Sequence, residues 1–193
     1  YVIVRAGHWR NILLFLVILP FWTSFLIRTY AIIVLLRGGG VVNSTLMGLG
    51  VTTAPLELLY TPGAVLAGLV YGYLPFMVLP IYASLERLDL DLVDAAEVLG
   101  ARPFARFRRV ILPLSLPGVA AGSLLVFIPS LGAFLTPDLL GGAKTMMLGN
   151  LVQNQFGPAR NWPFGAAVSF ALMGVVLVGL LAWLRVRDAE AAA

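Results

Sequence analysis

The sequence predicts an all-α, polytopic membrane protein. Hydrophobic residues make up 60% of the 193 residues and charged residues only 11%, whereas a soluble domain carries about 25% charged residues. Four long stretches contain almost no charge, and each is long enough to cross a bilayer as a helix, which takes about 20 residues. The charged residues gather between and beyond these stretches. We therefore expect four membrane-spanning helices joined by polar loops.

The first span is expected at residues 12–36, where Arg28 is the one charge. Pro20 lies near the middle of this span and has no backbone N–H to donate, so it is expected to kink the helix. The next segment, residues 41–60, contains too many polar residues to cross a membrane. We expect it to include a short helix that lies in the membrane interface.

The remaining spans are expected at residues 63–85, 110–135 and 163–184, which contain no charged residue. Prolines inside three of the four spans predict bends at membrane depth, which are tolerated where the backbone faces protein or a water-filled path. Two of the spans also carry glycines four residues apart, a spacing that lets another helix backbone approach closely. These pairs are Gly68 with Gly72, and Gly118 with Gly122.

A charged loop, residues 86–109, lies between the second and third spans. We expect Asp91 to cap a helix in its first half, which places Asp94 at the third helical position, near the positive end of the helix dipole. Gly100 suits the end of that helix because glycine adopts a positive φ at low cost. Pro103 suits the first turn of a second helix. These residues alone favour a helix-turn-helix coupling element and an ordinary basic loop about equally.

Counting lysine and arginine residues predicts the orientation. If the charged loop is cytoplasmic, nine of the 13 basic residues lie inside, three lie outside, and Arg28 lies in the membrane. The positive-inside rule then places this loop and both ends of the chain in the cytoplasm. The inside residues are Arg5, Arg10, Arg87, Arg102, Arg106, Arg108, Arg109, Arg185 and Arg187, and the outside residues are Arg37, Lys144 and Arg160.

Several kinds of chemistry are excluded by residues that the sequence lacks. There is no cysteine and a single histidine, His8, so no metal site is expected. No predicted span contains an acidic residue, a Ser-His-Asp set or a hydrophilic stripe, which argues against an intramembrane enzyme and a passive channel. Residues 141–145 resemble a phosphate-binding loop, but the spacing of that motif fails. The net charge of +4 is confined to loops, so no nucleic-acid partner is expected.

Four residues are candidates for lining a translocation path. Arg28 has two interpretations: a path residue with a partner on another helix, or a side chain that reaches outward to the interface. Aromatic rings such as those of Trp22 and Tyr71 attract cations, although packing against lipid or in the interfacial aromatic belt explains many such rings. The candidate path residues are Trp22, Thr23, Arg28 and Tyr71.

The charged loop and the start of the third span resemble the EAA loop of ABC importer membrane subunits, with the pattern E-A-A-x3-G-x9-I-x-L-P. Asp94 replaces the glutamate and Val110 replaces the isoleucine of that pattern, and both replacements keep charge or shape. The resemblance implies that the loop docks on an ATP-hydrolysing subunit. The matching positions are Asp94, Ala95, Ala96, Gly100, Val110, Leu112 and Pro113.

Further stretches are similar to the polyamine (spermidine/putrescine) branch of these permeases. The resemblance implies the type I ABC importer fold, which usually has six spans, and these four look like the last four. Residues 1–193 are therefore expected to form one transmembrane domain that lacks its first two spans. The stretches concerned are residues 18–31, 69–89, 137–156 and 160–167.

The same resemblance implies a set of partners in the bacterial inner membrane. These are a second permease subunit, a dimer of ATPase subunits that use ATP–Mg, and an extracytoplasmic solute-binding protein. The chain itself is expected to bind no cofactor and to catalyse no reaction. Related permeases for iron(III), sulfate or other small solutes share the loop, so a solute other than a polyamine is the alternative.

Overall fold

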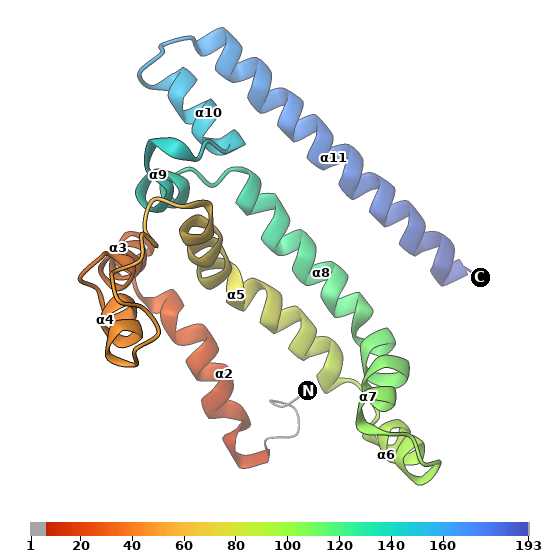
Figure 1. Cartoon of the computed structure of the whole chain (residues 1–193). Coiled ribbons are helices and arrows are strands. Elements are labelled where there is room, and N and C mark those ends of the chain that lie inside the picture. Colours follow the sequence, from red (N-terminus) through yellow and green to blue (C-terminus); the bar gives the residue numbers. More distant parts are fainter. Residues whose placement is uncertain (1–6, 193) are drawn as a thin grey trace.

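The computed structural model describes residues 7–192, and within this range the chain forms helices and no strand (Figure 1). The all-α architecture predicted from composition and the number of predicted spans are confirmed. Four helical runs are long and apolar enough to cross a membrane. They are Phe25–Gly48, Pro62–Glu86, Pro103–Leu131 and Trp162–Arg185.

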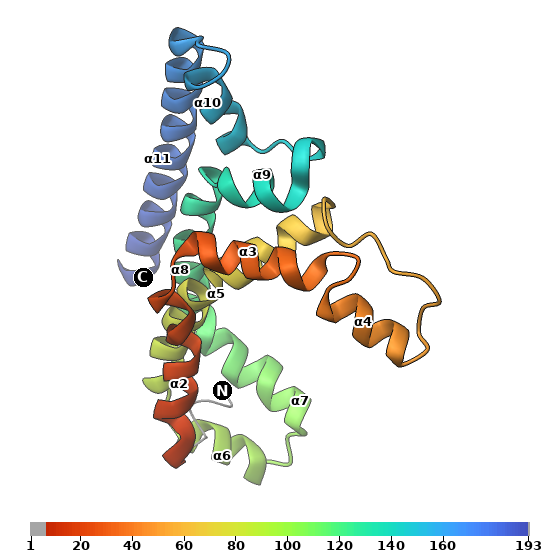
Figure 2. The same cartoon turned by 90° about the vertical axis from the view of Figure 1, so that its left-hand side faces the viewer.

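The prediction of a single helix over residues 12–36, kinked at Pro20, is wrong. The structure forms α2 (Arg10–Ile18), a 3-10 turn (Leu19–Trp22) and α3 (Phe25–Leu36). The chain is extended at Thr23 (ψ 148°) and Ser24 (ψ 139°), and α3 runs across the direction of α2 (Figure 2). At 1.5 Å per residue these helices rise about 14 and 18 Å, so neither alone spans the roughly 30 Å core.

Pro20 and Thr23 explain why the expected kink is a complete break. Pro20 offers no N–H, and its carbonyl oxygen accepts from the Thr23 N–H at 3.3 Å and from the Thr23 hydroxyl at 2.8 Å. Thr23 thus closes a tight turn on Pro20 and leaves the helical conformation. The first candidate span of the structure therefore begins after this break, at Phe25.

A short helix does form within residues 41–60, as α4 (Val41–Gly48), but it lies inside the first candidate span, Phe25–Gly48, and not outside the spans as expected. Its fully buried Asn43 fixes the loop that follows. The Asn43 amide donates to the Leu56 carbonyl at 2.9 Å and accepts from the Leu56 N–H at 2.8 Å. A further 3.3 Å bond from Asn43 to the Arg37 carbonyl holds the end of α3 to the same side chain. One amide therefore replaces hydrogen bonds that this irregular backbone could not make internally.

The close pairing of α5 (Pro62–Glu86) and α8 (Leu112–Leu131) forms the centre of the structure. A Cβ atom added at Gly118 would lie 2.6 Å from the Ser84 Cβ and 2.7 Å from the Pro80 carbonyl oxygen. One added at Gly122 would lie 2.9 Å from the Met77 sulfur. The predicted close approach at this glycine pair is therefore confirmed.

The two glycines of the other predicted pair face different helices. A Cβ atom at Gly68 would lie 2.3 Å from the Leu140 Cδ1, so this glycine makes room for α9 (Leu135–Gly141). At Gly72 the nearest atom is a ring carbon of Phe25 at 3.7 Å, which is ordinary contact. Leu140 is fully buried in a small cluster with Ala64 and Val65 at the start of α5.

The segment between the third and fourth spans folds over the end of the α5–α8 pair as α9 and α10 (Leu148–Phe156) (Figure 1). The buried Asn150 joins the two helices by donating to the Phe134 carbonyl at 2.9 Å and to the Asp138 carboxylate at 2.5 Å. The last helix, α11 (Trp162–Ala192), packs against α10 at its start and then runs apart from α8 (Figure 1).

The packing at Gly118 generates a stability prediction. Gly118→Leu in the full-length protein should lower the thermal unfolding midpoint in detergent, because the added side chain meets the α5 backbone and overpacking costs about 1–3 kcal/mol. Gly174→Leu on α11 is the matched control, since a Cβ atom there meets nothing within 4 Å. Equal midpoints for the two variants would show that the close approach of α5 and α8 does not determine stability.

Candidate functional site

The charged loop folds as α6 (Leu90–Val98), a turn, and α7 (Pro103–Arg106), at the end of the molecule opposite α9 and α10 (Figure 1). The predicted helix-turn-helix is therefore confirmed. The second helix is continuous with the third span, because a π-helical turn (Phe107–Ile111) connects α7 directly to α8. A movement of this loop would therefore act directly on α8.

The predicted N-cap of α6 is wrong by two residues. Asp89, not Asp91, caps the helix, and its carboxylate accepts from the Asp91 N–H at 3.0 Å. Both aspartates can cap a helix, and the earlier one does so because α5 already ends at Glu86. Asp94 consequently lies at the fifth helical position rather than the third, and Asp91 occupies the first turn.

The turn at Gly100 matches the prediction in detail. Gly100 has φ +75°, and its N–H donates to the Glu97 carbonyl at 2.9 Å. The Ala101 N–H reaches back to the Ala96 carbonyl at 3.0 Å, which is the bonding of a helix that ends on a left-handed glycine. A Cβ atom at Gly100 would meet nothing within 4 Å. The requirement for glycine here is therefore conformational and not steric.

Val93 anchors the loop to the two central helices. It is 1% exposed and packs with Leu85 at the end of α5 and with Ile111 at the start of α8. An ion pair between Glu97 and Arg106 joins α6 to α7. These contacts tie the loop to both helices of the central pair, so the loop and that pair form one packed unit.

The outward surface of the loop combines apolar and basic side chains. Val98 and Leu99 are 88% and 86% exposed. Leu99 is exposed because α6 ends at Val98 and the chain turns away there. Apolar side chains exposed on a loop are candidates for contact with another protein. The surface consists of Leu92, Val98, Leu99, Phe104 and Phe107, with exposed Arg102, Arg108 and Arg109 beside them.

The residues of the EAA-like pattern divide between exposed and half-buried positions. Asp94, Ala95, Leu112 and Pro113 are exposed. Ala96 and Val110 are half-buried and line a hollow of about 450 Å³ between α6 and α7, as Gly100 does. Sequence reasoning missed Ile111 as a core contact, because the EAA-like pattern specifies the residues on either side of it and leaves position 111 open.

The candidate path residues do not meet in one cavity. Trp22 is 77% exposed beside the α2–α3 break, with its ring edge-on to Phe15 at 5.6 Å. Tyr71 lines a hollow against α2, together with Leu13, Leu16, Val17, Pro20, Leu74 and Pro75. Arg28 is half-buried against aromatic rings of its own segment.

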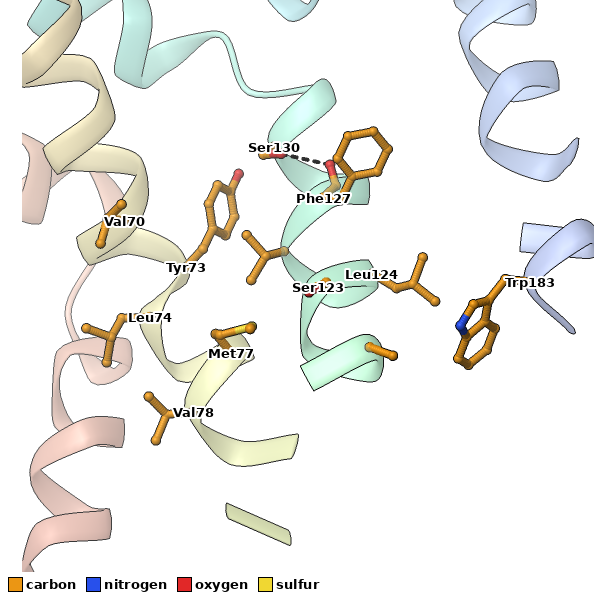
Figure 3. Close-up of a pocket in the computed structure, with 12 residues that line it drawn as sticks. Val70, Tyr73, Leu74, Met77, Val78, Ser123, Leu124, Phe127, Ser130 and Trp183 are labelled. Atoms are coloured by element: carbon orange, nitrogen blue, oxygen red, sulfur yellow. Dashed lines mark hydrogen bonds between the residues drawn. The ribbon is translucent and has the colours of Figure 1, made fainter. Parts of the chain in front are cut away.

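A hollow of about 800 Å³ opens on the side of α5 and α8 that faces α11 (Figure 3). Its walls are almost entirely apolar, and none of the candidate path residues lines it. Tyr73 crosses one end, where its hydroxyl donates to the Pro129 carbonyl at 3.3 Å. The main lining residues are Val70, Tyr73, Met77, Leu124, Phe127 and Trp183.

Residues 3–187 match the family described as the binding-protein-dependent transport system inner membrane component. The chain belongs to this family. The permease fold predicted from the loop and from the four spans is therefore correct. The family match covers almost the whole chain, and it agrees with the helix-turn-helix that the structure places between the second and third spans.

Several curated permeases are similar to this chain over most of its length. It is 51% identical over 179 residues to the spermidine/putrescine transport system permease protein PotB of Haemophilus influenzae, covering 93% of this chain and 62% of that protein. It is 48% identical over 176 residues to PotB of Escherichia coli, covering 91% and 64%. The inner membrane ABC transporter permease protein YdcU of E. coli is 40% identical over 186 residues, covering 91% and 58%. The chain thus spans somewhat less than two thirds of these relatives.

The geometry of the permease's loop generates a coupling prediction. Gly100→Val should weaken co-purification of the ATPase with the full-length permease several-fold while membrane insertion stays normal. Valine at a positive φ costs about 1–3 kcal/mol, and relieving that strain would reorient the surface around Val98. Gly50→Val is the matched control, because Gly50 has φ +70° and equally open surroundings but lies in the opposite loop. Equal ATPase binding by both variants would contradict a coupling role for the α6–α7 turn.

Proposed function

We propose that this chain is the membrane-spanning part of an ATP-driven importer for spermidine and putrescine. The single observation that carries the proposal is the match to two PotB permeases at 48–51% identity over more than nine tenths of the chain. The loop geometry supports it, because an exposed surface suited to a protein partner is packed directly onto two candidate spans. In the assembled importer the chain forms half of the translocation path.

The energy for transport comes from other subunits. An ATPase dimer that uses ATP–Mg docks on the surface of α6 and α7, a second permease completes the path, and an extracytoplasmic protein delivers the solute. The positive-inside rule favours an orientation in the bacterial inner membrane with the α6–α7 loop and both ends of the chain in the cytoplasm. In this orientation the loop faces the compartment that holds ATP.

The packing of Val93 supports a route for the mechanical step. When the ATPase subunits close, they displace α6, and the contacts of Val93 with Leu85 and Ile111 carry the displacement to α5 and α8. The Glu97–Arg106 ion pair keeps α6 and α7 together during this movement. Because tightly packed helices do not deform continuously, the whole unit moves and alternately opens the two sides of the path.

The near absence of acidic residues from the described candidate spans favours a low-affinity path for a polyamine rather than a tight binding site. A buried cation without a counter-charge costs several kcal/mol. The described candidate spans carry no carboxylate except Glu86, the last residue of α5. Aromatic faces such as those of Trp22 and Tyr71 supply about 0.5–2 kcal/mol each, which guides a partly hydrated cation without trapping it. Recognition of the solute then resides mainly in the binding protein.

A transport assay tests this function. The complete importer, reconstituted in liposomes, should take up spermidine or putrescine only when the binding protein is present. Trp22→Ala should lower the rate several-fold and change the apparent affinity less, since the ring acts along the path. Trp162→Ala, another exposed tryptophan at the start of α11, is the control and should leave both unchanged. Uptake of sulfate or iron(III) with no uptake of polyamines would refute the proposed solute.

A further inference from the structure

Arg28 is a charged side chain at membrane depth. Its guanidinium lies over the ring of Phe21, which packs edge-on against Phe76 of α5 with ring centroids 5.1 Å apart. Phe76 is ten residues from Glu86 and fourteen from Pro62, or about 15 and 21 Å along the helix. Arg28 therefore lies near the middle of the roughly 30 Å core that α5 crosses.

Two aromatic rings cover the guanidinium but leave its hydrogen bonds unmade. The Arg28 Cζ atom lies 5.2 Å from the centre of the Phe21 ring and 5.8 Å from that of Phe25. The Nε and Nη1 atoms are buried, and neither has a hydrogen-bond acceptor among the described residues. Ring faces attract the charge, but they do not replace the oxygen acceptors that a planar guanidinium pairs with.

The helix that carries Arg28 adds to the need for an anion. Arg28 is the fourth residue of α3, so it lies near the positive end of the helix dipole, where a cation is disfavoured. The helix runs across the direction of α2 (Figure 2), and the side chain of Arg28 lies against Phe21 and Phe25. These contacts disagree with the hypothesis that Arg28 reaches outward to the membrane interface.

The acidic residues whose contacts the structure describes have other partners, or lie in loops outside the spans. Glu86 pairs with Arg10, and Glu97 pairs with Arg106. Asp138 accepts from Asn150, and Asp89 caps α6. Within the described part of the chain, none of the candidate spans carries a carboxylate at the depth of Arg28.

We propose that Arg28 pairs with a carboxylate that a neighbouring permease subunit carries in the middle of the membrane. The pairing rests on the proposed function, because it requires a second permease. A buried charge needs a counter-charge and not merely a dipole. Lipid phosphates lie at the interface rather than at mid-depth, and a polyamine would be repelled. A helix can pack on the exposed flank of α3, where Ile27 and Tyr30 are 65% and 56% exposed, and Arg28 itself is only half-buried.

Such a pair would select the partner and its register. A single charged contact between apolar helices penalises every arrangement in which the two charges do not meet. The exposed apolar side chains of α3 supply contact area but little orientation. Arg28 would thus distinguish the correct second permease from other membrane helices.

The first test measures assembly of the full-length complex. Arg28→Met should reduce co-purification of the second permease by about tenfold or more, while the amount of chain in the membrane stays normal. Arg28→Lys should retain part of the association, since it keeps the charge but not the fork of donors. Arg37→Met is the matched control, because Arg37 is exposed at the end of the same helix. Full assembly with Arg28→Met would overturn the proposal.

A charge exchange then locates the partner. Arg28→Asp is combined in turn with an arginine replacement at each acidic residue in the spans of the second permease. One combination should restore co-purification that both single variants lose. The proposal fails if no combination does so, or if restoration comes only from an acidic residue of the same polypeptide. Co-purification does not depend on the solute, so a wild-type complex that ignores polyamines would refute the proposed function and leave this test valid.

Discussion

The close packing of α5 on α8 is the constraint on which the rest of the structure depends. Gly118 and Gly122 let the α8 backbone approach the backbone of α5 near Pro80 and Met77, and in a membrane such close contact replaces much of the hydrophobic driving force. At one end the pair holds α6 through Val93. At the other end α5 receives α9. Both loops are therefore positioned by a single helix–helix contact.

This arrangement suits a subunit that is moved by others. In the proposed function, the chain converts a push at the loop into a movement of spans. A coupling element transmits a movement only if it is rigid where the force acts. The structure meets this need by running α7 into α8 without a break and by ending α6 on a left-handed glycine, Gly100. At Thr23, by contrast, the chain leaves the helical conformation, so α2 and α3 are separate helices, and one flank of α3 is exposed.

Much of the fold could be predicted from the sequence, because it is encoded locally. Apolar length predicts the later spans, and Gly100 predicts its turn since few residues adopt a positive φ. The break after Pro20 could not be predicted, because it depends on the turn that Thr23 closes. The EAA-like spacing locates the loop but does not show that Val93 is its anchor. The partner of Arg28 is equally beyond the sequence of one chain, because the described residues do not contain it.

In the proposed mechanism, the α6–α7 loop moves with α5 and α8 as one rigid unit. The chain has no cysteine, so spin labels at Asp91→Cys on α6 and at Ile128→Cys near the far end of α8, both exposed positions, report on it without background. Pulsed electron–electron double resonance should give the same distribution of distances between the two labels in the nucleotide-free and the ATP-bound importer. A shift of several ångströms between the two states would show that the loop moves relative to the pair and would contradict this account of coupling.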